Sequence, residues 1–201
     1  MYLERIGDRQ AALALKQIVE DVPDLQYDLE KLVKENQSKV YNVCLSILQN
    51  PADAEDISQE VFMHIISHIG QFRNQSELST WIYRVTVNKC LEELRSRKRK
   101  KRWARLVSLG GNFEEEVDVP HFEHPGVLLE NKERADILFS MMARLPDKQN
   151  VAFTLHRIEG LSYKEISDVM KISISAVESL IHRAKGNLQK SLKVFYQKQW
   201  L

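Results

Sequence analysis

The longest helical pattern in the sequence runs from Thr80 to Arg105 without a break and ends in concentrated positive charge. Its first half carries Trp81, Arg84 and Asn88, and residues 95–105 hold eight Lys and Arg with no Asp or Glu. Such a helix can hold the phosphates of a nucleic acid through its basic end and contact bases through its aromatic, Arg and Asn side chains. The sequence therefore predicts one long helix suited to nucleic acid.

Charge is unevenly distributed along the chain. The net charge of +1 conceals the basic run over residues 95–105 and an acidic segment over residues 106–130, which holds six Asp and Glu and no Lys or Arg. This asymmetry favours nucleic-acid contact at defined places over a uniformly basic coat. A solvated helix end or a disordered tail is the alternative for any single charged run, but the aromatic residues beside the basic run count against it.

Composition indicates an all-α fold. The 201 residues include only 7 Gly and 5 Pro, and no segment alternates clearly between apolar and polar residues. The length fits one large or two small domains, and a hydrophobic content of 43% can form real cores. Cys44 and Cys90 form no C-x-x-C pair, so neither a disulfide framework nor a zinc site is indicated.

The sequence also predicts where the protein resides. No apolar stretch approaches the roughly 20 residues that a bilayer requires, and the N-terminal residues lack a signal-peptide pattern. We therefore expect no membrane insertion and no export by that route. A reducing cytoplasm fits the two cysteines best.

Residues 110–126 mix turn formers with acidic residues and show no helical period, which predicts a linker. His121 and His124 within it could form a metal pair, but no further ligands lie near them in the sequence, and neither a metal nor a cofactor is expected. We expect helices on both sides of this linker, over residues 8–20, 29–48, 53–68, 81–105, 127–144 and 147–158, followed by a further helix pair.

The helix predicted over residues 53–68 has an apolar side and an acidic side. On a helical wheel the acidic side consists of Asp53, Asp56, Glu60 and Ser67, opposite Ile57, Val61, Ile65 and Ile69. The carboxylates could bind a metal in a phosphoryl-transfer or nuclease site, although no second carboxylate cluster converges on them. Alternatively, Asp53, Glu55 and Asp56 complement the helix dipole at its N-terminus.

The long helix separates a packing face from a recognition face. Its apolar arc consists of Tyr83, Val87, Cys90, Leu91 and Leu94, and should face the core. Arg84, Asn88 and Arg95 fall on a separate narrow arc with Trp81 beside them. Arg can bind phosphate, Asn can hydrogen-bond a base edge, and Trp81 can either stack on a base or pack beneath the loop over residues 72–79.

A helix-turn-helix pattern follows near the end of the chain. Ser162 and Glu165 match a capping box, residues 171–173 form a turn, and a second helix begins near Ile174. The inward arc of that helix is Ile174, Val177, Leu180, Ile181, Ala184 and Leu188. The outward residues, of types that read a major groove, are Ser175, Glu178, Ser179, His182 and Arg183.

Several of these motifs, in order and in register, resemble the extracytoplasmic-function sigma factors of the sigma-70 family. The matching segments are Asp53–Phe62, Phe72–Arg73, Ser79–Val85 with Asn88, Leu145–Pro146 and Glu159–Ile166. The resemblance implies a promoter-specificity subunit of bacterial RNA polymerase that has no catalytic activity. It implies two helical domains, sigma region 2 and sigma region 4, joined by a flexible acidic linker. The implied boundaries are an N-terminal extension over 1–26, region 2 over 27–105, the linker over 106–130 and region 4 over 131–201.

The resemblance also assigns sites. Asp53, Asp56, Gln59 and Glu60 would bind the polymerase core. The minus-10 promoter element would be captured, as an unstacked base, by a larger set consisting of Phe72, Arg73, Trp81, Arg84, Asn88 and Arg95. The outward residues of the last helix, Ser175, Glu178, Ser179, His182 and Arg183, would read the minus-35 element as duplex. An anti-sigma factor is a further implied partner.

Some positions depart from the family pattern. Glu178 stands where a basic residue is frequent, Lys171 replaces a frequent turn Gly, and Glu92 replaces a common Asp, so the promoter preference cannot be transferred. Two other classes of function compete with the resemblance. They are a stand-alone helix-turn-helix regulator, which would usually dimerise and bind a palindrome alone, and a magnesium-dependent nucleic-acid-processing enzyme that uses the carboxylates of residues 53–60.

Overall fold

The computed structural model describes residues 23–69, 77–107 and 132–199, and its regular structure there is entirely helical, as predicted. The helices are α2 (Pro23–Leu48), α3 (Pro51–His68), α4 (Leu78–Val107), α5 (Lys132–Met142), α6 (Asp147–Arg157), α7 (Tyr163–Met170) and α8 (Ile174–Gln199). The predicted helix over 8–20, Phe72, Arg73 and the segment 110–126 lie outside the described residues. Within the described ranges, none of the helices is both long and apolar enough to cross a membrane.

Local signals in the sequence place the helix ends. Asn50 caps α3, because its side-chain oxygen accepts a hydrogen bond of 3.1 Å from the backbone N–H of Asp53, and Pro51 follows in the first turn. The predicted capping box of α7 is present, with Ser162 and Glu165 satisfying each other's backbone N–H groups. Lys171 ends α7 in the left-handed region at φ 54°, a conformation that favours glycine.

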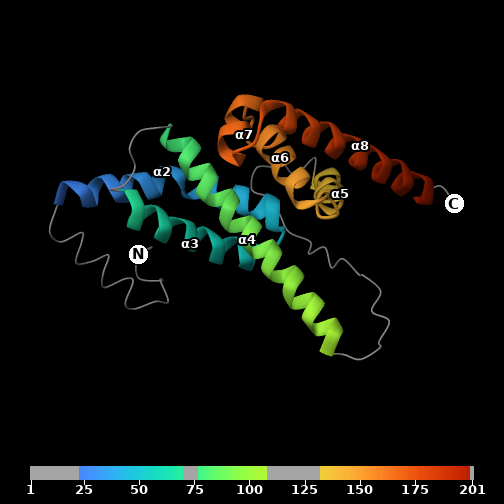
Figure 1. The fold of residues 1–201 in the computed structure, drawn as a ribbon, viewed down its shortest axis with the longest axis horizontal. Helices are drawn as coiled ribbons and strands as arrows, with labels where there is room; N and C mark the ends of the chain where they lie inside the picture. Colours follow the sequence, from blue (N-terminus) through green and yellow to red (C-terminus); the bar gives the residue numbers. More distant parts are fainter. Residues whose placement is uncertain (1–22, 70–76, 108–131, 200–201) are drawn as a thin grey trace.

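We call α2, α3 and α4 the first unit, and they pack pairwise against one another. The apolar side predicted for α3 is confirmed at Ile57, Val61 and Ile65, which are buried against the other two helices. The long predicted helix is confirmed as a single element, and it continues to Val107, two residues into the predicted linker. Its C-terminal half extends beyond α2 and α3 (Figure 1).

We call α5, α6, α7 and α8 the second unit. The predicted helix-turn-helix is present as α7 and α8, and both contact α6. Val177, Ile181, Ala184 and Leu188 are buried as expected. Ile174 was expected to face inward but is 50% exposed, because it is the first residue of α8 and has no preceding helical turn to cover it.

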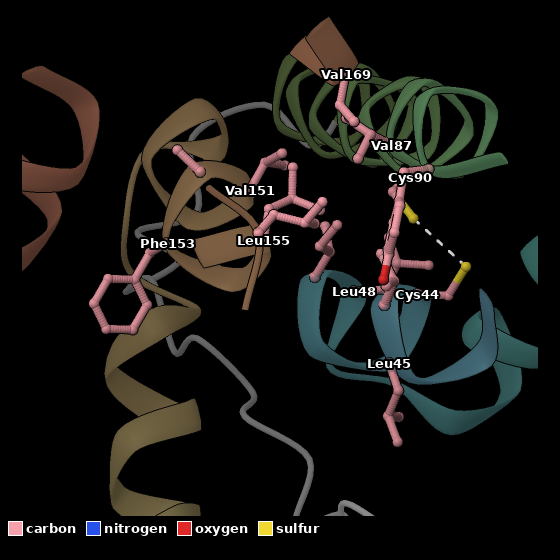
Figure 2. Close-up of a cluster of buried hydrophobic side chains, with 14 of the residues drawn as sticks. Cys44, Leu45, Leu48, Val87, Cys90, Val151, Phe153, Leu155 and Val169 are labelled. Atoms are coloured by element: carbon pink, nitrogen blue, oxygen red, sulfur yellow. Dashed lines mark hydrogen bonds between the residues drawn. The ribbon is translucent and has the colours of Figure 1, made fainter. Parts of the chain in front are cut away.

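Both units contribute to one hydrophobic cluster. Helix α7 packs on α4 and α6 packs on α2 (Figure 1). Figure 2 shows Val169 of α7 beside Val87 of α4, and Val151 and Leu155 of α6 directed toward Leu48 of α2. The apolar arc of α4 therefore packs against the second unit as well as against α2 and α3.

The two cysteines meet inside this core. The thiol of Cys90 on α4 donates to the sulfur of Cys44 on α2 at 3.7 Å, and both residues are fully buried and free (Figure 2). The hydrogen bond to Cys44 and burial together raise the pKa of the Cys90 thiol. Because the thiolate is the reactive form, this pair behaves as core packing.

Candidate nucleic-acid interface

The acidic side of α3 is partly neutralised by basic residues of α4. Arg97 lies 2.6 Å from a carboxylate oxygen of Asp53, and Lys89 lies 3.0 Å from one of Glu60. Asp56 is exposed and Gln59 is half-buried. The four residues predicted to bind polymerase therefore lie together on one helix, where Asp56 and Glu60 are accessible and Asp53 also ties α3 to α4.

These ion pairs count against a magnesium-dependent enzyme that uses the carboxylates of residues 53–60. A metal site needs several carboxylates aimed at one point, whereas Asp53 and Glu60 are each aimed at a cation of α4. Among the residues that the structure describes, no group of three or more His, Cys, Asp and Glu side chains is arranged to hold a metal ion.

The residues of the predicted recognition arc of α4 differ in how far they are exposed to solvent. Asn88 and Arg95 are exposed, and Trp81 is half-buried and packed against the hydrophobic cluster. Arg84 is half-buried, and its guanidinium donates a hydrogen bond of 3.0 Å to the backbone carbonyl of Asp168, in the last turn of α7. Arg84 is therefore engaged by the second unit, while Asn88 on the next turn is accessible.

A second polar contact joins the units beside Arg84. The hydroxyl of Tyr83 donates to a carboxylate oxygen of Glu159 at 2.9 Å, and Lys39 lies over the Tyr83 ring at 5.8 Å. Burial raises the pKa of Glu159, although the hydrogen bond from Tyr83 and the charge of Lys39 oppose this effect. Burial and the neighbouring Glu159 also raise the pKa of Tyr83.

The basic end of α4 contains two kinds of residue. Arg97 is paired with Asp53 and Glu93, and Lys98 lies 2.7 Å from Asp147 of α6. The others whose side chains are described are exposed and leave the helix surface strongly positive: Arg95, Arg99, Lys100, Lys101 and Arg102. Trp103, which is 70% exposed, lies beside them. A surface of this composition suits phosphates and an unpaired base.

Four of the five residues predicted to point outward from α8 are exposed. Ser175, Glu178, His182 and Arg183 are exposed, and Ser179 is half-buried. Arg183 donates a hydrogen bond of 2.8 Å to the Ser179 hydroxyl, which orders both side chains across one helical turn. Side chains of these types can read base edges in a major groove.

The contacts between the units were not found by sequence reasoning. Tyr83 and Glu159 are separated by 76 residues, and Lys98 and Asp147 by 49. For Tyr83 the sequence could have predicted that a hydrogen-bond partner exists, since its hydroxyl needs one when the ring is buried. Nothing in the sequence indicates which residue supplies that partner.

These features are those of a helical nucleic-acid-binding protein. Its two polar surfaces are the helix-turn-helix of α7 and α8, and the recognition arc and basic end of α4. The family model of Sigma-70 region 2 matches residues 32–100, and that of Sigma-70 region 4 matches residues 135–188. The ECF RNA polymerase sigma factor SigW of Bacillus subtilis is 30% identical over 183 residues, covering 89% of this chain and 95% of that protein. The RNA polymerase sigma-H factor of Pseudomonas aeruginosa is 28% identical over 163 residues, covering 81% and 84%.

Solved structures share the fold. The sigma factor RpoE of Bartonella quintana, crystallised with the anti-sigma factor NepR, aligns with a TM-score of 0.63 at 22% identity, covering 83% of this chain and 98% of that one. CnrH in complex with the cytosolic domain of CnrY aligns with a TM-score of 0.59 at 21% identity, covering 90% and 96%.

The chain belongs to the extracytoplasmic-function sigma factors of the sigma-70 family. It functions as an RNA polymerase sigma factor in transcription initiation, as the resemblance implied. The match to region 2 as well as to region 4 does not favour a stand-alone helix-turn-helix regulator.

Proposed function

We propose that three surfaces divide the work of initiation. Asp53, Asp56, Gln59 and Glu60 on α3 bind the polymerase core. The arc of Trp81, Arg84, Asn88 and Arg95 on α4, together with Phe72 and Arg73, captures the minus-10 element. The outward face of α8 reads the minus-35 element. In this proposal the first unit is the region 2 domain within residues 27–105, and the second unit is the region 4 domain within residues 131–201.

The observation that carries the proposal is the separation of accessible polar surfaces of different chemistry. Asp56 and Glu60 expose carboxylates on α3, whereas Asn88 and Arg95 expose an amide and a guanidinium on α4. Carboxylates repel phosphate, so the α3 surface suits a basic protein partner, and the α4 surface suits DNA. Capture of an extruded base on α4 would select sequence and help to open the duplex.

The proposal extends to the setting of the protein. It acts without catalytic chemistry of its own, in the cytoplasm, where bacterial polymerase and DNA are found. The RpoE structure contains the anti-sigma factor NepR, and the CnrH structure contains the cytosolic domain of CnrY. These complexes support an anti-sigma factor as a partner of this protein as well. Residues 106–130 would form the connection that lets the two units reach separate promoter elements.

The central experiment combines the protein with core polymerase and fragmented DNA of the source genome, and sequences the transcripts. Initiation from a defined set of sites, absent with core polymerase alone, is the expected result. Transcripts identical to those of core polymerase alone would refute the proposed function.

A charge reversal tests the α3 assignment. The double change Asp56→Arg, Glu60→Arg should weaken binding to core polymerase while leaving the helical content intact. Glu35→Arg with Glu77→Arg is the matched control, because both residues are exposed and lie outside the α3 surface. Equal polymerase affinity in the two double variants would count against the assignment.

A further inference from the structure

The first residue of α8 places an apolar side chain on the surface of the helix-turn-helix. Ile174 is 50% exposed, whereas Val177, the next branched aliphatic residue of the same helix, is fully buried. Single exposed apolar side chains are common on protein surfaces. Ile174 is distinguished by its position, because residues at the start of the second helix of a helix-turn-helix contact base edges when that helix enters a major groove.

Ile174 lies at the edge of the outward face of α8. Residues four apart on a helix are neighbours on its surface, with roughly 5 to 6 Å between their Cβ atoms, so Ile174 adjoins Glu178. Ser175 follows Ile174 directly, and both Ser175 and Glu178 are exposed. The accessible surface at the start of α8 therefore combines an aliphatic group with a hydroxyl and a carboxylate.

Hydrogen bonds around the turn hold the backbone of Ile174 in place. The hydroxyl of Ser167 donates to the carbonyl of Ile172 at 2.6 Å, and the N–H of Ile172 donates to the carbonyl of Ser167 at 3.3 Å. Ser173 caps the first turn of α8, because its hydroxyl accepts a hydrogen bond of 3.2 Å from the N–H of Ala176. The start of α8 is therefore fixed within the protein itself.

The side chain of Ile174 has little conformational freedom to lose. Branching at Cβ restricts its χ1 angle, so an isoleucine pays a smaller entropic cost on contact than a flexible side chain such as Met or Lys. Val177, one turn further along, is part of the hydrophobic cluster and anchors the helix. An apolar group of a ligand therefore meets a preformed surface, and little ordering cost opposes the contact.

The chemistry of Ile174 selects the group that it can contact in a major groove. An aliphatic side chain forms no hydrogen bond with a base edge or a phosphate, and it gains free energy only when apolar surface leaves water. Thymine carries a methyl group, on its C5 atom, in the major groove, and aliphatic contacts with this group distinguish it from the other bases. Ile174 therefore suits thymine.

We propose that Ile174 is a specificity-determining residue of this sigma factor, and that its side chain contacts the C5-methyl group of one thymine in the minus-35 element. The inference rests on the proposed role of the outward face of α8 in reading that element. It adds one apolar contact to a set of residues that is otherwise polar.

Glu178 indicates where this thymine lies. The carboxylate of Glu178 suits the amino group of a cytosine. Successive bases are about 3.4 Å apart along the duplex, whereas the Cβ atoms of residues 174 and 178 are roughly 5 to 6 Å apart. The thymine that Ile174 contacts, on either strand, therefore lies within about two base pairs of the position that Glu178 reads.

Selection from a promoter library tests the position of the contact. The full chain is combined with core polymerase and with duplexes of promoters recovered in the transcription experiment, randomised over the minus-35 region. The unaltered protein should enrich thymine at one position, and Ile174→Ser should lose that preference and keep the others. Glu178→Gln should change the preference within about two base pairs of this position and leave the thymine itself enriched.

Uracil substitution isolates the methyl group. Uracil lacks only the C5-methyl group of thymine and presents the same O4 acceptor, so readout by hydrogen bonds is unchanged. Replacing the selected thymine by uracil should weaken binding of the unaltered protein about fourfold, the effect of one methyl-sized apolar contact. Ile174→Val, which keeps the branched Cβ, should respond as the unaltered protein does. Ile174→Ser should bind the two duplexes equally well, and fluorescence anisotropy measures each affinity.

Val194→Ser is the matched control. Val194 is 52% exposed on the same helix but lies in its C-terminal half, away from the turn. The control variant should distinguish uracil from thymine as the unaltered protein does. Circular dichroism confirms that each variant keeps its helical content.

Other results would overturn either the inference or the proposed function. If Ile174→Ser enriches the same thymine, or is as sensitive to uracil as the unaltered protein, Ile174 does not contact the methyl group. If Ile174→Ser loses affinity equally for all duplexes, the residue supports binding without reading sequence. If the unaltered protein directs initiation but selects no sequence in the minus-35 region, the assignment of α8 to that element fails with the inference. If it directs no initiation, the proposed function itself fails.

Discussion

The two units present their DNA-facing surfaces in opposite ways. In the second unit the outward face of α8 is accessible, with Arg183 already ordered by Ser179. In the first unit the corresponding face of α4 is partly covered, and Arg84 caps the end of α7. A polar arc on a helical wheel is therefore not yet a free surface. A neighbouring unit can satisfy the same donors that DNA would satisfy.

Substitutions in the core should change the free energy of unfolding most, and they show whether the two units unfold together. Ile65→Ala in the first unit and Ile181→Ala in the second should each cost about 2 to 5 kcal/mol, because both side chains are almost fully buried. With one shared core, each variant lowers the midpoint of a single unfolding transition followed by circular dichroism. Val194→Ala, at a position 52% exposed, is the control. Two separate transitions, of which only one moves in each variant, would break the shared-core description.

A smaller effect is expected at the open face. Arg183→Ala should weaken binding to a duplex minus-35 element by about 1 to 3 kcal/mol, since an Arg contact to a base edge is lost. Fluorescence anisotropy with promoter fragments recovered from the transcription experiment measures this. Lys190→Ala, exposed further along α8, should change the affinity much less. Equal losses at the two positions would show that the face is not read as proposed.

Substitutions on the covered face of α4 should affect strand opening, a later step than duplex binding. Asn88→Ala or Arg84→Ala should impair strand opening more than initial duplex binding, because their contacts form with an extruded base. The loss of one hydrogen bond at Asn88, roughly 1 kcal/mol, predicts about fivefold less opening. Permanganate reactivity of promoter thymines reports opening, and Glu92→Ala is an exposed control on the same helix. If these variants lost duplex affinity as much as strand opening, the two units would not act at different steps.

The smallest effect is a pH dependence of the contact between the units. Burial raises the pKa of Glu159 above its usual 4.5, with Tyr83 and Lys39 facing it, so the two units bind the proton more tightly when packed together than when apart. The contact between the units is therefore most stable below pH 4.5 and weakens as pH rises through the raised pKa. Glu159→Gln keeps an acceptor for Tyr83 and should remove this dependence.

Energy transfer between dyes on Lys100→Cys and Lys148→Cys measures the distance between the two units, because these exposed positions lie on α4 and α6. Glu35→Gln is the control, and the pH dependence should persist in it. A curve for Glu159→Gln that matches the unaltered protein over the same range would assign the effect to another group.

Much of the fold could be predicted because its signals are local. Asn50–Pro51 starts α3, Ser162 and Glu165 form the capping box of α7, and the apolar period of residues 174–188 defines the buried side of α8. Each of these signals acts within one or two helical turns, which the sequence displays directly. The prediction at Ile174 failed at a helix end, where the wheel has no neighbouring turn to bury the side chain.

The helices, the helix-turn-helix, the acidic side of α3 and the recognition arc of α4 could all be predicted from the sequence, because charge and period are properties of short segments. The shared core of α4 and α7, and the contacts of Arg84 and Tyr83 with the second unit, became visible only when the helices were packed together. These contacts join residues more than 70 positions apart. Their partners are selected by how whole helices pack, and no local pattern encodes that choice.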